Sequence, residues 1–327
     1  MTDAGPARAG ASRVPVRALV DAVAAGLRRP VTADDWRPAV QGAVGHVVGL
    51  SDAEGAAYVA KVYAADAHRR AETEEVALRL LRDVDGVPAP DVVLVDALPG
   101  GRPFVLLTRL PGVRWADRRA RLDRAEHAEL LREVADVLRR VHAVRGSRFG
   151  SVGSVGSVGS RAEHRRATAW DRLGDVLARE LPAFLSHGGS PDLARRVRDH
   201  VLRRRDLFPA ELAPTLCHND LNGGNVLVTP TGKARVTGVV DLERASWDDP
   251  LSDLALTVRH VRQHDPSLVP TLLERYGLAD GGASERLETH VLLGVLAERT
   301  WVALDRPPGW AATVAALDAV LEETAEG

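Results

Sequence analysis

Hydrophobic and polar positions alternate with two different periods along the chain, and the change between them divides the sequence. Between residues 38 and 112, short β-branched runs surround Gly-containing turns, which predicts two hairpins. A helical period separates the hairpins at 69–84, where Val76, Leu80, Leu81 and Val84 share one face. A further amphipathic helix is predicted over 14–31. The first third of the chain is therefore expected to be rich in β-structure.

The pattern becomes helical from residue 124 onward. Apolar residues recur there at i, i+3 and i+4, and similar helices are predicted near 167–186, at 192–204 and from 250 on. Only a short β region at 214–241 interrupts them. The predicted class is α+β with two lobes: a small β-rich N-terminal lobe over 1–112 and a larger, mainly helical C-terminal lobe over 113–327.

A repeated segment, GSVGSVGSVGS at 150–160, lies between the predicted helices. Glycine-rich loops often bind phosphates, but this segment lacks the spacing of a phosphate-binding loop and no predicted strand leads into it. We interpret it as a low-complexity segment within a flexible loop over 146–161, without direct chemistry.

Composition and charge exclude several classes of protein. The 327 residues have a formal net charge of −2 and no strongly basic block, which disfavours nucleic acid or an anionic membrane as a partner. No apolar run approaches the ~20 residues needed to span a bilayer, and the charged N-terminal stretch is a poor signal peptide, so we expect a cytoplasmic protein. Cys217 is the only cysteine, which rules out an internal disulfide and a cysteine-based zinc cage.

Charge is distributed unevenly along the chain. The segment from Asp241 to the end carries 16 acidic and 7 basic side chains, so its net charge is about −9 and that of the rest about +7. This segment is either a solvated acidic surface or a wall that attracts a cationic ligand.

Lysine is rare in this arginine-rich sequence. Of 43 basic side chains only Lys61 and Lys233 are lysine. Because the compact ammonium of lysine does not behave like a guanidinium, a lysine retained in such a sequence is a candidate functional residue. Lys61 lies in a predicted strand, YVAKVY, after the Gly-containing turn.

The segment TLCHNDLNGGNVLVTPTGKARVTGVVDLE, residues 215–243, contains the strongest candidate chemistry. His218, Asp220 and Asn225 have the spacing of a kinase catalytic loop, and a predicted hairpin then returns the chain to Asp241. Phosphoryl transfer requires such groups: a carboxylate that accepts a hydroxyl proton, and oxygen ligands for magnesium. A polar loop without function and a metal-dependent hydrolase built on His218 are the alternatives. We expect His218 to hydrogen-bond the loop backbone.

These residues, with the following segment ERASWDDPLSDLA, resemble the aminoglycoside phosphotransferase family, which is related to choline kinases and has a protein-kinase-like fold. The resemblance covers residues 35–310 and is sharp only over 215–255. The chain has Asp241-Leu242-Glu243 where protein kinases have Asp-Phe-Gly, which leaves the role of Glu243 open.

The resemblance implies a role for each candidate residue. Asp220 would be the catalytic carboxylate, and Asn225 and Asp241 would bind Mg²⁺. In the small lobe, Lys61 would hold the nucleotide phosphates and Glu74 would position it. The nucleotide-binding set would be completed by two glycines of the phosphate-covering loop, Gly42 and Gly45, and by a hinge at 104–110. We expect Lys61 to converge with the three oxygen-bearing residues on one magnesium–triphosphate.

The expected function is ATP- and Mg²⁺-dependent phosphorylation of a hydroxyl on a small molecule, with GTP left open as the donor. The acidic C-terminal region favours a cationic antibiotic, an aminoglycoside or a basic peptide, and hence a role in resistance. The alternatives are a kinase of a small metabolite, such as a sugar amine, a choline-like compound or an amino alcohol, and a nucleotide-binding module without catalysis. Substrate-contact candidates are Asp248, Asp249, Glu298 and Asp305, and Asp253 is expected to cap a helix.

Overall fold

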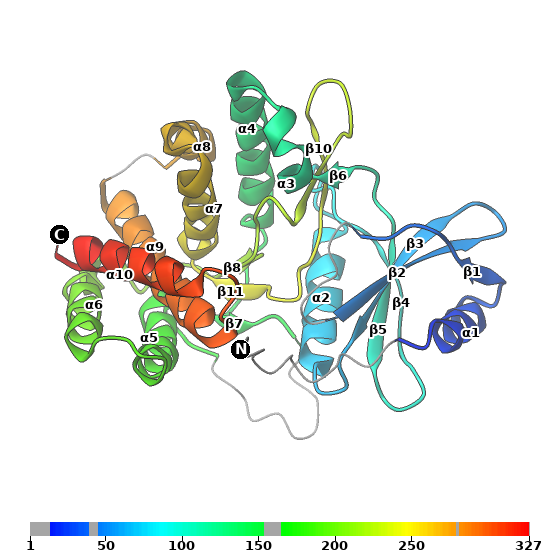
Figure 1. Ribbon diagram of the computed structural model, residues 1–327, viewed down its shortest axis with the longest axis horizontal. Helices are drawn as coiled ribbons and strands as arrows, with labels where there is room; N and C mark the ends of the chain where they lie inside the picture. Colours follow the sequence, from blue (N-terminus) through cyan, green and yellow to red (C-terminus); the bar gives the residue numbers. More distant parts are fainter. Residues whose placement is uncertain (1–13, 39–44, 154–164, 279–280, 327) are drawn as a thin grey trace, which may run out of the picture. The chain divides into compact units, whose positions relative to one another are not determined.

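The computed structural model describes residues 14–38, 45–153, 165–278 and 281–326, and it separates into two compact units (Figure 1). Unit 1 comprises residues 1–83 and 89–111, and unit 2 comprises residues 84–88 and 112–327. None of the helices in the described ranges is long and apolar enough to cross a membrane.

Unit 1 is built on a five-stranded antiparallel sheet with the strand order β1-β2-β3-β5-β4. The strands are β1 (Val31–Ala33), β2 (Gly45–Asp52), β3 (Ala57–Tyr63), β4 (Val92–Ala97) and β5 (Pro103–Thr108). The pairs β2–β3 and β4–β5 confirm the two predicted hairpins. The short edge strand β1 was not predicted, because three residues are too few to show a period.

Two helices cover opposite faces of this sheet (Figure 1). Helix α1 (Val16–Leu27) buries Leu19 and Val23 in a cluster that includes Ala60 and Val62 of β3. Because side chains alternate along a strand, Lys61 between them points to the other face. Helix α2 (His68–Leu81) packs against β3, β4 and β5 and turns the buried Glu74 toward Lys61.

The predicted helix at 69–84 is correct in kind but differs in its end and its buried face. It ends at Leu81, and its fully buried apolar side chains are Ala71, Ala77, Leu78 and Leu81. Val76 and Leu80 are only partly buried. The buried face of the helix also includes Glu74, a residue that the apolar pattern does not mark.

Unit 2 is mainly helical, as predicted. Its helices are α3 (Trp115–Arg118), α4 (Arg124–Val141), α5 (Ala169–Ser186), α6 (Pro191–Arg203), α7 (Pro250–His264), α8 (Val269–Tyr276), α9 (Gly281–Asp305) and α10 (Trp310–Glu326). Local sequence fixes the start of α4, where Asp123 and Glu126 form a capping box. Together the two units confirm the α+β class.

Two small antiparallel sheets lie among these helices. One has the order β10-β9-β6 and the other β7-β11-β8. Their strands are β6 (Val113–Arg114), β7 (Gly150–Ser151), β8 (Thr215–Cys217), β9 (Val226–Val228), β10 (Val236–Val239) and β11 (Ser246–Asp248). The segment 218–225 therefore connects β8 of one sheet to β9 of the other.

The loop predicted over 146–161 has defined structure in its first half. Gly150 and Ser151, the start of the Ser-Val-Gly repeat, form β7 and pair with Trp247 and Ser246. Val152 is buried. The repeat is thus entered by a short strand, contrary to the prediction, and residues 154–160 lie outside the described residues.

Candidate active site

Unit 1 contains the predicted pair of Lys61 and Glu74. The Lys61 ammonium lies 3.1 Å from Oε2 of Glu74 and 3.3 Å from its Oε1. The Tyr63 hydroxyl donates to the same carboxylate, and the Lys61 ammonium lies 5.2 Å from the centre of the Tyr63 ring. The Glu74 side chain is 1% exposed and that of Lys61 12%. This pair holds the Lys61 ammonium in place on the face of the sheet that α2 covers.

The glycines predicted to cover a phosphate are only partly described. Gly45 begins β2 and pairs with Tyr63 of β3. Gly42 lies outside the described residues. The predicted hinge, residues 104–110, overlaps most of β5, and Arg109, the residue after this strand, donates its backbone N–H to the carbonyl of Ala57.

Unit 2 places Asn225 beside Asp241. The strands β9 and β10 pair so that Val226 lies opposite Val239, and the Val240 N–H donates to the Asn225 carbonyl at 3.0 Å. Asp241 follows directly, with the left-handed backbone angle φ of 72°. The Asn225 amide nitrogen donates to the Asp220 carbonyl at 2.8 Å. This hairpin brings the three predicted site residues of unit 2 together.

The donor set at this site fits magnesium. Because the Asn225 Nδ2 is used in the loop, its Oδ1 is the atom left for a ligand, and Asp241 follows Val240, whose N–H donates to the Asn225 carbonyl. Amide and carboxylate oxygens are the hard ligands that Mg²⁺ prefers. Asn225 and Asp241 are therefore the residues that would hold this ion.

The Asp220 carboxyl has a raised pKa. Burial is the main cause, and the neighbouring Asp241 carboxylate adds to it, while Arg244, His218 and a hydrogen bond from Asn222 act in the opposite direction. The Asn222 amide donates to Oδ1 of Asp220 at 3.0 Å. A carboxylate with a raised pKa is a better proton acceptor at neutral pH than an ordinary aspartate.

His218 supports the loop, as the sequence predicted. Its Nδ1 accepts the Asp220 backbone N–H at 3.2 Å, so the proton lies on Nε2, which donates to the Val240 carbonyl at 3.0 Å. His218 therefore connects the segment 218–225, the candidate catalytic loop, to Val240, which follows β10 and precedes Asp241.

Asp253 does not cap a helix, contrary to the prediction. The N-cap of α7 is Asp249, whose side chain accepts the Leu251 N–H. Asp253 is 0% exposed, and its two oxygens accept the backbone N–H groups of His218 at 2.7 Å and Asn219 at 2.9 Å. It thus holds the start of the catalytic loop.

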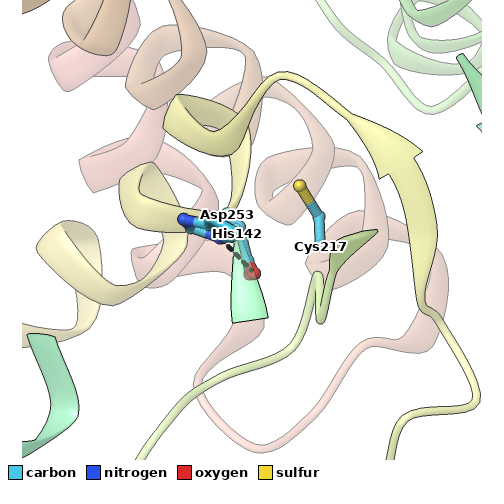
Figure 2. Close-up of side chains that lie close together, drawn as sticks. All are labelled: His142, Cys217 and Asp253. Carbon is cyan, nitrogen blue, oxygen red and sulfur yellow. Dashed lines mark hydrogen bonds and ion pairs between the residues drawn. The ribbon is translucent and has the colours of Figure 1, made fainter. Parts of the chain in front are cut away.

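A buried histidine accompanies Asp253. The His142 Nε2 lies 3.2 Å from Oδ2 of Asp253, and its Nδ1 lies 2.8 Å from the Tyr276 hydroxyl. Figure 2 shows this contact with Cys217 nearby. The side chains of His142, Cys217 and Asp253 are close enough together to hold a metal ion. However, the imidazole and the carboxylate already hydrogen-bond each other and neighbouring groups. We interpret this cluster as a buried support for the loop.

Asn219 provides a second connection that the sequence did not reveal. Its backbone has φ of 59°, and its amide nitrogen donates to the Arg244 carbonyl at 3.1 Å and to the Ser246 hydroxyl at 2.8 Å. The loop containing Asp220 is thereby fastened to the segment that follows Asp241. Asparagine is one of the few residues that accept this backbone conformation readily.

Three of the four substrate-contact candidates form ion pairs within the protein. Asp248 pairs with Arg172, Asp249 with Arg286 and His290, and Glu298 with Arg259. Asp305 is exposed at the end of α9. The first three are therefore compensated, and the excess of acidic residues after residue 241 does not amount to a free acidic wall at these positions.

The fold is that of the aminoglycoside phosphotransferases. A crystal structure of a thermostable mutant of aminoglycoside phosphotransferase APH(4)-Ia, in a ternary complex with AMP-PNP and hygromycin B, matches with a TM-score of 0.66 and 18% identity over 95% of this chain and 99% of that chain. The model of the phosphotransferase enzyme family matches residues 35–288. The chain belongs to this family.

Curated relatives match over shorter lengths. Viomycin phosphotransferase of Streptomyces vinaceus is 29% identical over 188 residues, which are 57% of this chain and 58% of that enzyme. An aminoglycoside 3'-phosphotransferase of Escherichia coli is 32% identical over 90 residues, covering 28% of this chain and 32% of that enzyme. The chain thus spans less than two thirds of the length of these relatives.

Proposed function

We propose that the protein transfers the γ-phosphoryl group of ATP to a hydroxyl of a small cationic antibiotic, an aminoglycoside or a basic peptide. The observation that supports this most is the grouping of Asp220, Asn225 and Asp241 in one loop and hairpin. Membership of the phosphotransferase enzyme family gives independent support.

Asp220 acts on the acceptor in this proposal. Its carboxylate orients the hydroxyl, whose oxygen forms a bond to the γ-phosphorus as the bond from that phosphorus to the bridging oxygen of ADP breaks. The hydroxyl proton passes to Asp220, whose raised pKa suits it to receive a proton. The Asn222 amide donates to Oδ1 of Asp220, and in this proposal the other carboxylate oxygen, Oδ2, receives the proton.

The remaining residues bind the nucleotide and its charge. Lys61, held by Glu74, binds the α- and β-phosphates. Asn225 and Asp241 would hold a magnesium ion, which would supply positive charge to neutralise the phosphates of the nucleotide. Most of the rate enhancement then comes from positioning and charge neutralisation by fixed groups.

The similarity to viomycin phosphotransferase supports a basic peptide as acceptor, and that to the aminoglycoside 3'-phosphotransferases supports an aminoglycoside.

One observation favours a second candidate, a kinase of a small metabolite such as a sugar amine or an amino alcohol. Because Asp248, Asp249 and Glu298 are already paired with arginines, they offer little free charge to a polycation.

A panel of acceptors distinguishes these candidates. The protein is incubated with Mg²⁺-ATP and each of viomycin, kanamycin, hygromycin B, choline, ethanolamine and fructosamine. The mass of each acceptor after the reaction is then measured by mass spectrometry. The proposal predicts that an antibiotic gains the mass of one phosphoryl group. Phosphorylation confined to the metabolites would support the second candidate. ATP binding without transfer to any acceptor would indicate a nucleotide-binding module.

A further inference from the structure

Helix α7 presents a line of polar side chains on a face that is otherwise apolar. Asp253, Thr257 and His260 are spaced at i, i+4 and i+7, so they share one face of the helix. Asp253 and Thr257 are almost fully buried, and Leu254, Ala255, Val258 and Val261 around them are buried as well. Polar groups in such a setting need partners.

The partners are successive backbone groups of the catalytic loop. Asp253 receives the N–H groups of His218 and Asn219, as described above. The Thr257 hydroxyl donates to the Leu221 carbonyl at 3.1 Å. The His260 Nε2 accepts the Gly223 N–H at 3.2 Å. One helix face therefore follows the loop from its first residue to a point two residues before Asn225.

Gly223 is held from both sides. Its carbonyl accepts the Ala116 N–H at 2.7 Å, while its own N–H reaches His260. A Cβ atom at this position would lie 2.5 Å from an Arg119 nitrogen and 3.0 Å from the His260 Nε2. The Arg119 and His260 side chains thus both approach the Gly223 backbone closely.

The surroundings of His260 keep its ring neutral. The Arg119 guanidinium contacts the same Nε2 atom and stacks on Trp115, whose ring also lies 6.2 Å from that of His260. Burial, Arg119 and His264 lower the pKa of His260 to about 4. With its proton on Nδ1, the ring presents Nε2 as an acceptor at neutral pH.

We propose that His260 is a positioning residue of the phosphotransferase, which acts through Gly223 to fix the loop between Asp220 and Asn225. This inference rests on the proposed function for its catalytic consequence. The position of Gly223 in the chain explains the role: it lies three residues after the carboxylate that receives the proton and two before the amide that holds the metal ion. Loss of the His260 acceptor leaves the Gly223 N–H without this partner, so the loop becomes less fixed at both Asp220 and Asn225.

The test compares substitutions that keep or remove the acceptor. His260→Gln retains an acceptor oxygen that can reach Gly223, and His260→Leu removes it. His264→Leu is the matched control, because His264 packs on the His260 ring from the same helix and is exposed. Hydrogen exchange of the peptide 218–226, followed by mass spectrometry, reports on the loop without any need for activity.

We expect His260→Leu to speed exchange in this peptide and to lower kcat, each by about tenfold, with the KM for ATP unchanged. His260→Gln should restore both values toward wild type, and His264→Leu should leave them unchanged. If His260→Leu does not fold, His260→Asn, whose side chain is too short to reach Gly223, replaces it. Unchanged exchange in a folded His260→Leu protein would overturn the inference, as would a Gln variant as defective as Leu. If the wild type transfers no phosphate, the proposed function fails, while the exchange measurement still decides the role of His260.

Discussion

The backbone nitrogen of His218 lies 2.7 Å from a carboxylate oxygen of Asp253, a residue 35 positions later in the chain. This bond joins the start of the catalytic loop to the first turns of α7. Asp253 is fully buried. Its carboxylate also accepts the Asn219 N–H and contacts the His142 Nε2, so its charge is compensated within the protein. The geometry of the candidate site thus depends on a carboxylate that we do not expect to touch a substrate.

Replacement of Asp253 should damage both folding and activity. Asp253→Ala leaves two buried N–H groups without acceptors, so we expect the free energy of unfolding to fall by about 3 kcal/mol. Asp253→Asn keeps one acceptor oxygen and should lie between this variant and wild type. Urea unfolding measures the loss. Asp136→Asn, which removes a surface ion pair with Arg275, is the control and should change stability by about 0.5 kcal/mol or less.

The two lysines of the chain provide a matched pair of variants. Lys61→Ala removes the ammonium held by Glu74, so we expect the KM for ATP to rise and kcat to fall, with a combined loss of at least about a hundredfold in kcat/KM. Lys233→Ala changes an exposed turn residue and should leave both constants unchanged. Steady-state kinetics with ATP as the varied substrate checks this. Equal losses in the two variants would show that Lys61 has no special role.

The left-handed backbone conformation of Asn219 leads to a prediction about the stability of its variants. Asn219→Ala loses the hydrogen bonds to Arg244 and Ser246 and leaves alanine, which tolerates the left-handed region less well than asparagine, at a φ of 59°. We expect it to lower the free energy of unfolding by about 2 kcal/mol. Asn219→Gly removes only the side-chain bonds and should cost less. Chemical denaturation of the two variants decides the matter: a glycine variant less stable than the alanine variant would contradict the backbone argument.

Stability should also depend on the protonation of a buried histidine away from the site. His200 is 3% exposed, and burial together with Arg204 and Arg203 lowers its pKa to about 4. The unfolded chain takes up this proton near pH 6.5, so the folded state loses stability as the pH falls from about 6.5 to about 4, by up to ~1.4 kcal/mol per pH unit. Unfolding free energies of wild type and His200→Gln measured between pH 7 and 5 test this. The unfolding free energy of wild type should fall more steeply with decreasing pH than that of His200→Gln. Parallel curves for the two proteins would contradict the lowered pKa of His200.

The contiguous part of the site was predictable from the sequence, and the supporting part was not. His218, Asp220, Asn225 and Asp241 lie within one segment whose spacing encodes a loop and a hairpin, and the arginine bias distinguished Lys61. Asp253 was misread because Pro250 and Ser252 before it resemble a helix start, and because its partners are backbone N–H groups that no sequence motif marks. The polar residues at i, i+4 and i+7 on an apolar helix were the available signal for Asp253, Thr257 and His260. The strands β7 and β11 have two and three residues, which is too short for any period to appear.

The most direct test of the account is the rate at which phosphate reaches an acceptor hydroxyl with and without the Asp220 carboxylate. Wild type and Asp220→Asn are compared with Mg²⁺-ATP and the acceptor that the panel identifies, with transfer followed by mass spectrometry and ATP affinity by titration. The account predicts that Asp220→Asn binds ATP as wild type does and transfers phosphate at least about a hundredfold more slowly. Equal transfer rates in the two proteins would contradict it.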